Sequence, residues 1–210
     1  AQDRDETEYD EVDYLFDSIY SYNYQMYLKE QDSLKLIALY KQINQTIDEN
    51  KTTKELEISN SSIVTLPERV VQLKNLESVV FYNCKQLDLE NTFEKLAQLP
   101  KLKSLKIVFS DKYSIPNNIG LLQNLEYLSL KQNKFVVTPD SLIKLQKLTE
   151  LDFSNNPYLN EDIFFERILG LKSLKKVNTQ FCRISTLPQS VQQLRIETLD
   201  LKGNLLENVP

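Results

Sequence analysis

Apolar residues recur along most of the chain in one fixed phrase. Residues 125–135 read L-E-Y-L-S-L-K-Q-N-K-F, with leucine at positions one, four and six, asparagine at nine and phenylalanine at eleven. The phrase occurs seven times, with first positions at Thr53, Leu76, Leu102, Leu125, Leu148, Leu174 and Ile196. Subtracting neighbouring first positions gives periods of 23, 26, 23, 23, 26 and 22 residues. This period predicts a solenoid in which each repeat supplies one strand and one return segment.

Positions four and six of each phrase alternate with polar or solvated positions, as expected for a strand with one buried face. These strand cores are Leu56/Ile58, Val79/Phe81, Leu105/Ile107, Leu128/Leu130, Leu151/Phe153, Val177/Thr179 and Leu199/Leu201. Position nine always holds a small group that can form hydrogen bonds, and the seven residues are Ser61, Cys84, Ser110, Asn133, Asn156, Cys182 and Asn204. We expect these side chains to bond backbone groups where the chain leaves each strand.

These motifs, which cover residues 53–210, resemble those of leucine-rich repeat proteins. The L-P-x-x-φ-x-x-L form of several return segments is similar to the 23-residue repeats of the bacterial and plant intracellular class. The resemblance implies an α/β fold: a right-handed solenoid with a curved parallel β-sheet on its concave side and short 3-10 or α segments on its convex side. It also implies an asparagine ladder at position nine and a protein–protein interaction function, without naming the partner.

The return segments fall into two groups. Four carry a proline at their start, followed by apolar residues three apart, which predicts short helical or 3-10 turns; these prolines are Pro67, Pro116, Pro139 and Pro188. The two 26-residue repeats lack this proline, and their three extra residues add most of a helical turn. We therefore expect α-helices within residues 90–99 and 161–170.

The N-terminal quarter has a different pattern. Residues 1–13 carry seven acids and one arginine, a net charge of −6, so residues 1–11 are expected to form a disordered tail. Helical spacing from Val12 to Ile47 predicts a helical cap over residues 12–52, which would cover the first repeat of the domain at 53–210. Two helices are favoured, with Asp32 or Ser33 as the N-cap of the second. One long bent helix is the alternative, since no glycine or proline precedes Pro67.

Composition excludes several classes of chemistry. The chain has no histidine and only three well-separated glycines, which rules out His-based catalysis and a glycine-rich phosphate loop. The carboxylate pairs Glu55/Glu57 and Glu150/Asp152 could serve glycoside hydrolysis or Ca²⁺ binding, but solvated positions on a repeat face explain them better. We therefore predict no enzymatic activity, no cofactor and no metal.

The overall charge, the hydropathy and the cysteines argue against a nucleic-acid ligand, a membrane span and a disulfide. The net charge of −5 less the −6 of residues 1–13 leaves +1 for the rest, so nucleic acid is not an expected ligand. No apolar run is long enough to span a membrane. Cys84 and Cys182 lie four repeats apart, about 19 Å at the spacing of strands, and cannot form a disulfide within one chain.

Alternate strand positions and the residue after each strand predict a binding surface. Apolar and aromatic residues gather there in repeats two to four, beside lysines, which is typical of interaction sites. The predicted partner-binding residues are Val80, Tyr82, Lys106, Val108, Phe109, Tyr127, Lys131 and Asp152. The alternative is that Val108 and Phe109 are covered by the cap or a neighbouring turn.

We predict a protein ligand held on the concave face, with Tyr82 and Tyr127 as anchors. An adhesion or glycan-binding surface protein is the alternative, and a structural spacer is a third. A chain that begins at Ala1 is expected to be an exported protein, at the cell surface, in the periplasm or secreted, although buried thiols also suit the cytoplasm. The final repeat stops at Pro210, so either the parent protein continues or two copies pair end to end as a homodimer.

Overall fold

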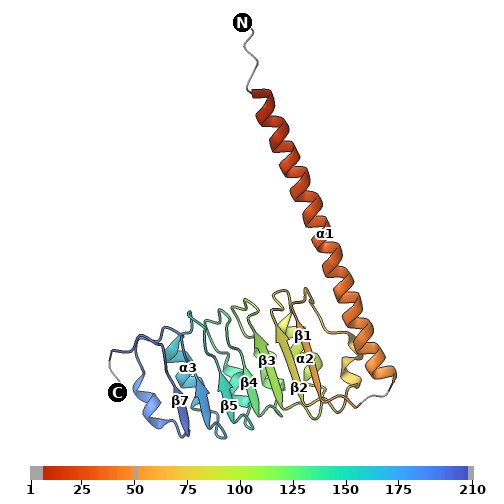
Figure 1. The fold of residues 1–210 in the computed structure, drawn as a ribbon. Coiled ribbons are helices and arrows are strands. Elements are labelled where there is room, and N and C mark those ends of the chain that lie inside the picture. Colours follow the sequence, from red (N-terminus) through yellow and green to blue (C-terminus); the bar gives the residue numbers. More distant parts are fainter. Residues whose placement is uncertain (1–6, 50–51, 208–210) are drawn as a thin grey trace.

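The computed structural model describes residues 7–49 and 52–207. Seven strands lie side by side in chain order and form one parallel sheet (Figure 1). The strands are β1 (Glu55–Ser59), β2 (Ser78–Tyr82), β3 (Ser104–Val108), β4 (Tyr127–Ser129), β5 (Glu150–Asp152), β6 (Lys176–Asn178) and β7 (Thr198–Asp200). Each repeat of the sequence therefore supplies one strand, and the predicted α/β repeat solenoid is confirmed.

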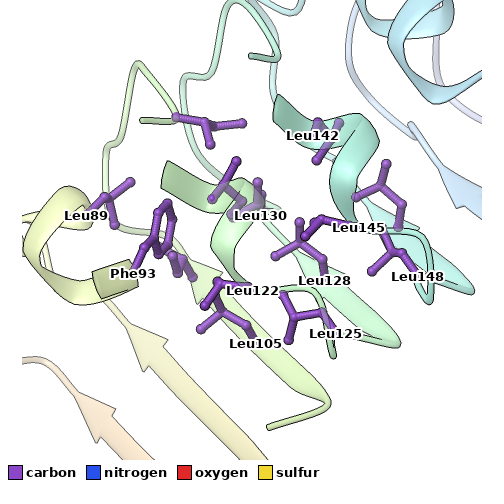
Figure 2. Packing of buried hydrophobic residues seen from close by; sticks show 14 of the residues in the cluster. Leu89, Phe93, Leu105, Leu122, Leu125, Leu128, Leu130, Leu142, Leu145 and Leu148 are labelled. Atoms are coloured by element: carbon purple, nitrogen blue, oxygen red, sulfur yellow. The ribbon is translucent and has the colours of Figure 1, made fainter. Parts of the chain in front are cut away.

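The leucine phrase accounts for the core. Leu128 and Leu130, at positions four and six of the fourth phrase, have no exposed surface, and Leu125 at position one is equally buried. Figure 2 shows these side chains meeting those of the neighbouring repeats, in the space between the sheet and the return segments. Because a one-residue shift in register would turn every leucine to solvent, burial fixes the pairing of each strand with the next.

The return segments follow the two predicted forms. Four are 3-10 turns, η1 (Glu68–Gln72), η2 (Asn117–Leu121), η3 (Asp140–Lys144) and η4 (Gln189–Gln193), and each is preceded by the proline noted in the sequence. The two longer repeats contain α2 (Leu89–Leu96) and α3 (Glu161–Ile168). Asp88 and Asn160 cap these helices by accepting hydrogen bonds from the amides of Asn91 and Ile163.

The prediction of two N-terminal helices is wrong. A single helix, α1 (Thr7–Asp48), contains both predicted segments and begins inside the region expected to be a disordered tail, of which residues 1–6 lie outside the described residues. Ser33, predicted as a possible N-cap, instead donates its hydroxyl to the Lys29 carbonyl one turn earlier at 2.8 Å, a bond compatible with a continuous helix. With 42 residues, α1 is about 63 Å long and leads away from the sheet (Figure 1).

Among the described side chains of α1, those of its last turns pack against the solenoid. Ile43 is buried, and Leu36, Leu39, Tyr40 and Ile47 pack partly buried against the core of the first repeat. Further contacts come from the Tyr40 hydroxyl, which donates to the Thr65 carbonyl at 2.8 Å, and from the Arg69 guanidinium, which bonds Asp48 at 2.6 Å. Among the described residues, no helix is long and apolar enough to cross a membrane.

Candidate functional site

The register of the sheet aligns the alternate positions of the strands in rows. Val80 of β2 pairs with Lys106 of β3, which pairs with Ser129 of β4. In the next row, Tyr82 pairs with Val108. These side chains share the face opposite to the buried leucines, because successive residues of a strand point to opposite sides.

The eight predicted binding residues differ in their exposure. Tyr82 and Phe109 are exposed, at 41% and 46%. Five are half-buried, namely Val80, Lys106, Tyr127, Lys131 and Asp152. Val108 is only 5% exposed, so its prediction as a surface residue is wrong. Its strand partner in β2 is Tyr82.

Tyr82 and Phe109 form an exposed aromatic pair at the carboxyl ends of β2 and β3. Their ring centroids are 6.0 Å apart with an interplanar angle of 25°, a stacked arrangement. The Lys85 ammonium lies 6.0 Å from the Phe109 centroid and bonds Asp111 at 2.9 Å. Asp111 also contacts Lys134 at 3.3 Å, and the hydrogen bonds from these two lysines hold the pKa of its carboxyl below the usual value. Lys85 was not among the predicted residues.

Phe109 adopts a backbone conformation that is unusual for its type. The residue at position eight has a positive φ in all seven repeats: Asn60, Asn83, Phe109, Gln132, Asn155, Phe181 and Gly203. Glycine and asparagine tolerate this region, whereas a bulky residue there is strained. Phe109 and Phe181 have φ values of 53° and 55°. Phenylalanine at a position that otherwise holds Asn, Gln or Gly was the sequence signal for these strained residues.

Lys106 and Tyr127 form a second contact on the same face. The Lys106 ammonium lies 5.5 Å from the centroid of the Tyr127 ring, within the range of a cation–π interaction. Burial raises the pKa of the Tyr127 hydroxyl, and a hydrogen bond involving Ser129 opposes this shift. The phenol therefore stays neutral at physiological pH and can donate a hydrogen bond.

The carboxylates of β5 are already engaged within the chain. Glu150 accepts a bond from the Lys176 ammonium at 2.8 Å. Asp152 accepts the amide of Ser154 at 3.0 Å and lies 3.4 Å from the Ser129 hydroxyl. Among the described residues, no group of three or more acidic or sulfur ligands could hold a metal ion. Glu150 and Asp152 therefore both make polar contacts within the chain.

The side chains at position nine bond the backbone between repeats. The Asn133 carboxamide oxygen accepts the amides of Ser110 at 3.0 Å and Lys112 at 3.2 Å. Its nitrogen lies within hydrogen-bond distance of three carbonyl oxygens, those of Ile107 (2.8 Å), Leu130 (3.0 Å) and Lys131 (3.1 Å). Asn156 and Asn204 make similar contacts, which tie each turn to the preceding repeat.

Both cysteines are buried, free thiols at position nine. The Cys84 sulfur contacts the Ile58 carbonyl at 3.3 Å, and the Cys182 sulfur contacts the Phe153 carbonyl at 3.2 Å. Burial raises the pKa of both thiols, that of Cys182 to about 11. Each therefore remains a protonated donor that replaces asparagine in the row, with little of the thiolate that a reactive cysteine needs.

Comparisons with known proteins give relatives that are much longer than this chain. The adenylate cyclase of Schizosaccharomyces pombe is 30% identical over 158 residues, which are 74% of this chain and 9% of that protein. Leucine-rich repeat-containing protein 58 of Xenopus tropicalis is 34% identical over 90 residues, which are 42% of this chain and 25% of that protein. No family model matches the chain.

Solved structures give the same result for the fold. A leucine-rich repeat protein of Leptospira interrogans is 26% identical, with a TM-score of 0.61, over 80% of this chain and 47% of that one. Internalin C2 of Listeria monocytogenes is 22% identical, with a TM-score of 0.55, over 70% of this chain and 61% of that one. The repeat period, the parallel sheet and these similarities agree, and the chain is a leucine-rich repeat protein.

Proposed function

We propose that the chain is a non-enzymatic protein-interaction module that binds its partner on the concave face of β2–β4. The observation that carries the proposal is the exposed Tyr82–Phe109 stack, with the Lys106–Tyr127 contact beside it. Tyrosine supplies a large contact area and loses few rotatable bonds on binding, so such residues dominate the energetics of interfaces.

The surrounding framework supports rigid recognition. Each of these side chains is anchored on a strand, or directly after one, in a sheet with continuous register. A partner would therefore meet a surface that is already ordered, and little binding energy would be lost in organising it. The engaged carboxylates of β5 favour binding over catalysis on this face.

Affinity capture from extracts of the source organism, read by quantitative mass spectrometry, tests the proposal. The bait proteins are the unaltered chain, the double variant Tyr82→Ala/Tyr127→Ala and the control Tyr158→Ala. Tyr158 is 54% exposed but lies outside the strands. The control therefore removes the same type of side chain as the double variant, but from outside the proposed binding face. We expect at least one protein to be retained by the unaltered chain and the control and lost by the double variant. Equal retention by all three baits would contradict the proposal.

Glycan binding is the second candidate, because exposed tyrosine beside asparagine and aspartate also suits sugar recognition. A glycan array probed with the same three proteins separates the two functions. Sugar binding that the double variant loses, together with no captured protein, would favour the glycan reading. Export from the cytoplasm and end-to-end pairing of two copies through the last repeat both stay predictions from the sequence.

A further inference from the structure

The binding face carries an excess of positive charge at its centre. We define the lysine–aromatic patch as Tyr82, Lys85, Lys106, Phe109, Tyr127 and Lys131, which belong to repeats two to four. Lys106 lies on β3, and Lys131 lies two residues after Ser129, the β4 residue that pairs with Lys106. From the spacings of a sheet, their Cα atoms are about 8 Å apart. Three lysines and three aromatic residues thus belong to three consecutive repeats of a chain whose net charge is −5, and Lys85 is the one of these lysines that is paired with an acid, Asp111.

Some lysines elsewhere on the solenoid are paired with acids of the same chain. Lys54 bonds Glu77 at 3.0 Å, Lys103 bonds Glu126 at 2.9 Å and Lys176 bonds Glu150 at 2.8 Å. Within residues 7–49 and 52–207, neither Lys106 nor Lys131 forms an ion pair. Both ammonium groups are therefore without an acidic partner of this chain on the face that carries the aromatic residues.

The strain at Phe109 is a second, independent observation. A phenylalanine at φ 53° costs free energy that asparagine or glycine would avoid at this position. Its ring is 46% exposed and stacks on Tyr82, so burial in the core does not repay the strain. Phe181 has the same conformation, but its ring packs over Gly203, where an added Cβ would lie 2.3 Å from ring atoms. Phe109 instead stacks on Tyr82 and lies near the Lys85 ammonium, and part of its surface remains exposed to a ligand.

Negative groups bound the patch on both sides. Glu55 and Glu57 stand on β1, one strand before Tyr82, and Asp152 stands on β5, one strand after Lys131. A long polyanion such as a nucleic-acid strand would meet these acids as soon as it extended beyond three repeats. A short ligand with its negative charge confined to the centre would avoid them.

We propose that the lysine–aromatic patch binds an acidic peptide segment that carries an aromatic or large apolar side chain. In an extended segment, side chains two residues apart point the same way and are separated by about 6.6 Å. Two carboxylates at that spacing match Lys106 and Lys131, while the apolar side chain packs against the Tyr82–Phe109 stack. This inference rests on the proposed protein-binding function and adds the chemistry of the partner.

A displayed library of random twelve-residue peptides tests the inference. The library is selected in parallel on the unaltered chain, on Lys106→Gln/Lys131→Gln and on the control Lys101→Gln/Lys147→Gln. The control removes the same charge from two lysines whose ammonium groups bond only asparagine side chains away from the patch. We expect peptides enriched in both acidic and aromatic residues on the unaltered chain and the control, and loss of this enrichment on the patch variant.

Fluorescence anisotropy with one selected peptide completes the test. The patch variant should weaken binding about tenfold or more, and the control should stay within about twofold. Neutral or basic selected peptides, no selected peptide, or equal affinity for the patch variant would each overturn the inference. Neutral peptides that still require Tyr82 and Tyr127 would leave the proposed function standing and remove only the acidic partner. An oligothymidine that binds with the same dependence on Lys106 and Lys131 would also overturn the peptide assignment.

Discussion

Replacing Asn133 by alanine tests how far one ladder side chain holds the solenoid together. The Asn133 side chain is 4% exposed, so water cannot readily replace the bonds that it makes. Its oxygen accepts the amides of Ser110 and Lys112, and its two N–H groups serve carbonyls of two repeats. Alanine would leave the two amides and the Ile107 carbonyl without this partner, while the Leu130 and Lys131 carbonyls would keep the bonds that they accept from Asn156 and from the Phe109 amide.

The magnitude follows from these three groups. A typical hydrogen bond contributes about 1 kcal/mol net, and a buried group left unpaired costs about 1–3 kcal/mol. Allowing for some relaxation and entry of water, we expect Asn133→Ala to lower the free energy of unfolding by about 3–5 kcal/mol. The matched control is Asn124→Ala, because Asn124 is exposed and bonds the Pro100 carbonyl and Lys147 at the surface. We expect the control to change stability by less than about 1 kcal/mol.

Urea unfolding followed by circular dichroism gives both free energies. Repeat arrays can unfold in parts, so hydrogen exchange is measured as well. The amides of Ser110 and Lys112 should lose protection in Asn133→Ala, while amides of β7 should change little. A loss of stability no larger than that of Asn124→Ala, with protection unchanged, would refute the reasoning about the ladder.

Three further predictions concern the turns, the surface charges and the thiols. Gly203→Ala should destabilise the chain by about 1–3 kcal/mol, since φ is +71° and the new methyl meets the Phe181 ring; thermal unfolding should show partial rescue by Phe181→Ala. The pKa of the Asp111 carboxyl is lower in the folded state than its ordinary value of 3.8. The ionised carboxylate therefore stabilises the fold at pH values above 3.8, and this stabilisation is lost as the pH falls through the folded-state pKa. Acid unfolding should therefore be less steep in Asp111→Asn, and identical pH profiles would contradict this. The Cys182 thiol, whose pKa is raised to about 11, should react with iodoacetamide at pH 8 only after denaturant is added, as mass spectrometry would show.

Much of the fold could be predicted because its signals are local and repeated. A leucine at position four or six has only one buried direction in a strand, so seven copies of the phrase determine the register without tertiary information. Return segments with and without proline were also separable, because proline fixes the start of a short turn and the longer segments have room for α2 and α3.

The number of N-terminal helices could not be predicted from the sequence. Ser33 suits an N-cap in isolation, but it equally well bonds the carbonyl one turn earlier, and no glycine or proline decides between the two. Sequence periodicity also could not reveal which side chains a neighbour covers. Val108 alternates correctly with Ile107 for a position on the exposed face, yet it is only 5% exposed.

The exposure of Tyr82 and Phe109 was predictable from the sequence, but their arrangement was not. Tyr82 and Phe109 occupy different positions of different repeats, so their stacking depends on the stagger between β2 and β3. Lys85 was missed because it follows the ladder position, where the chain has already left the strand. Only the folded turn brings its ammonium near the Phe109 ring.

The ladder and the lysine–aromatic patch are mechanically linked through one turn. The Phe109 amide donates to the Lys131 carbonyl at 3.3 Å, and the following amide, that of Ser110, donates to Asn133. Asn133 in turn donates to the Lys131 carbonyl. The backbone of the strained Phe109 and of the residue after it is therefore bonded to the turn that contains Lys131 and Asn133. Strain of this kind persists only where the surroundings determine the backbone more than once. The buried asparagine that stabilises the solenoid therefore also fixes the positions of Phe109 and Lys131, and a substitution that loosens it should weaken binding at the patch even though Asn133 touches no ligand.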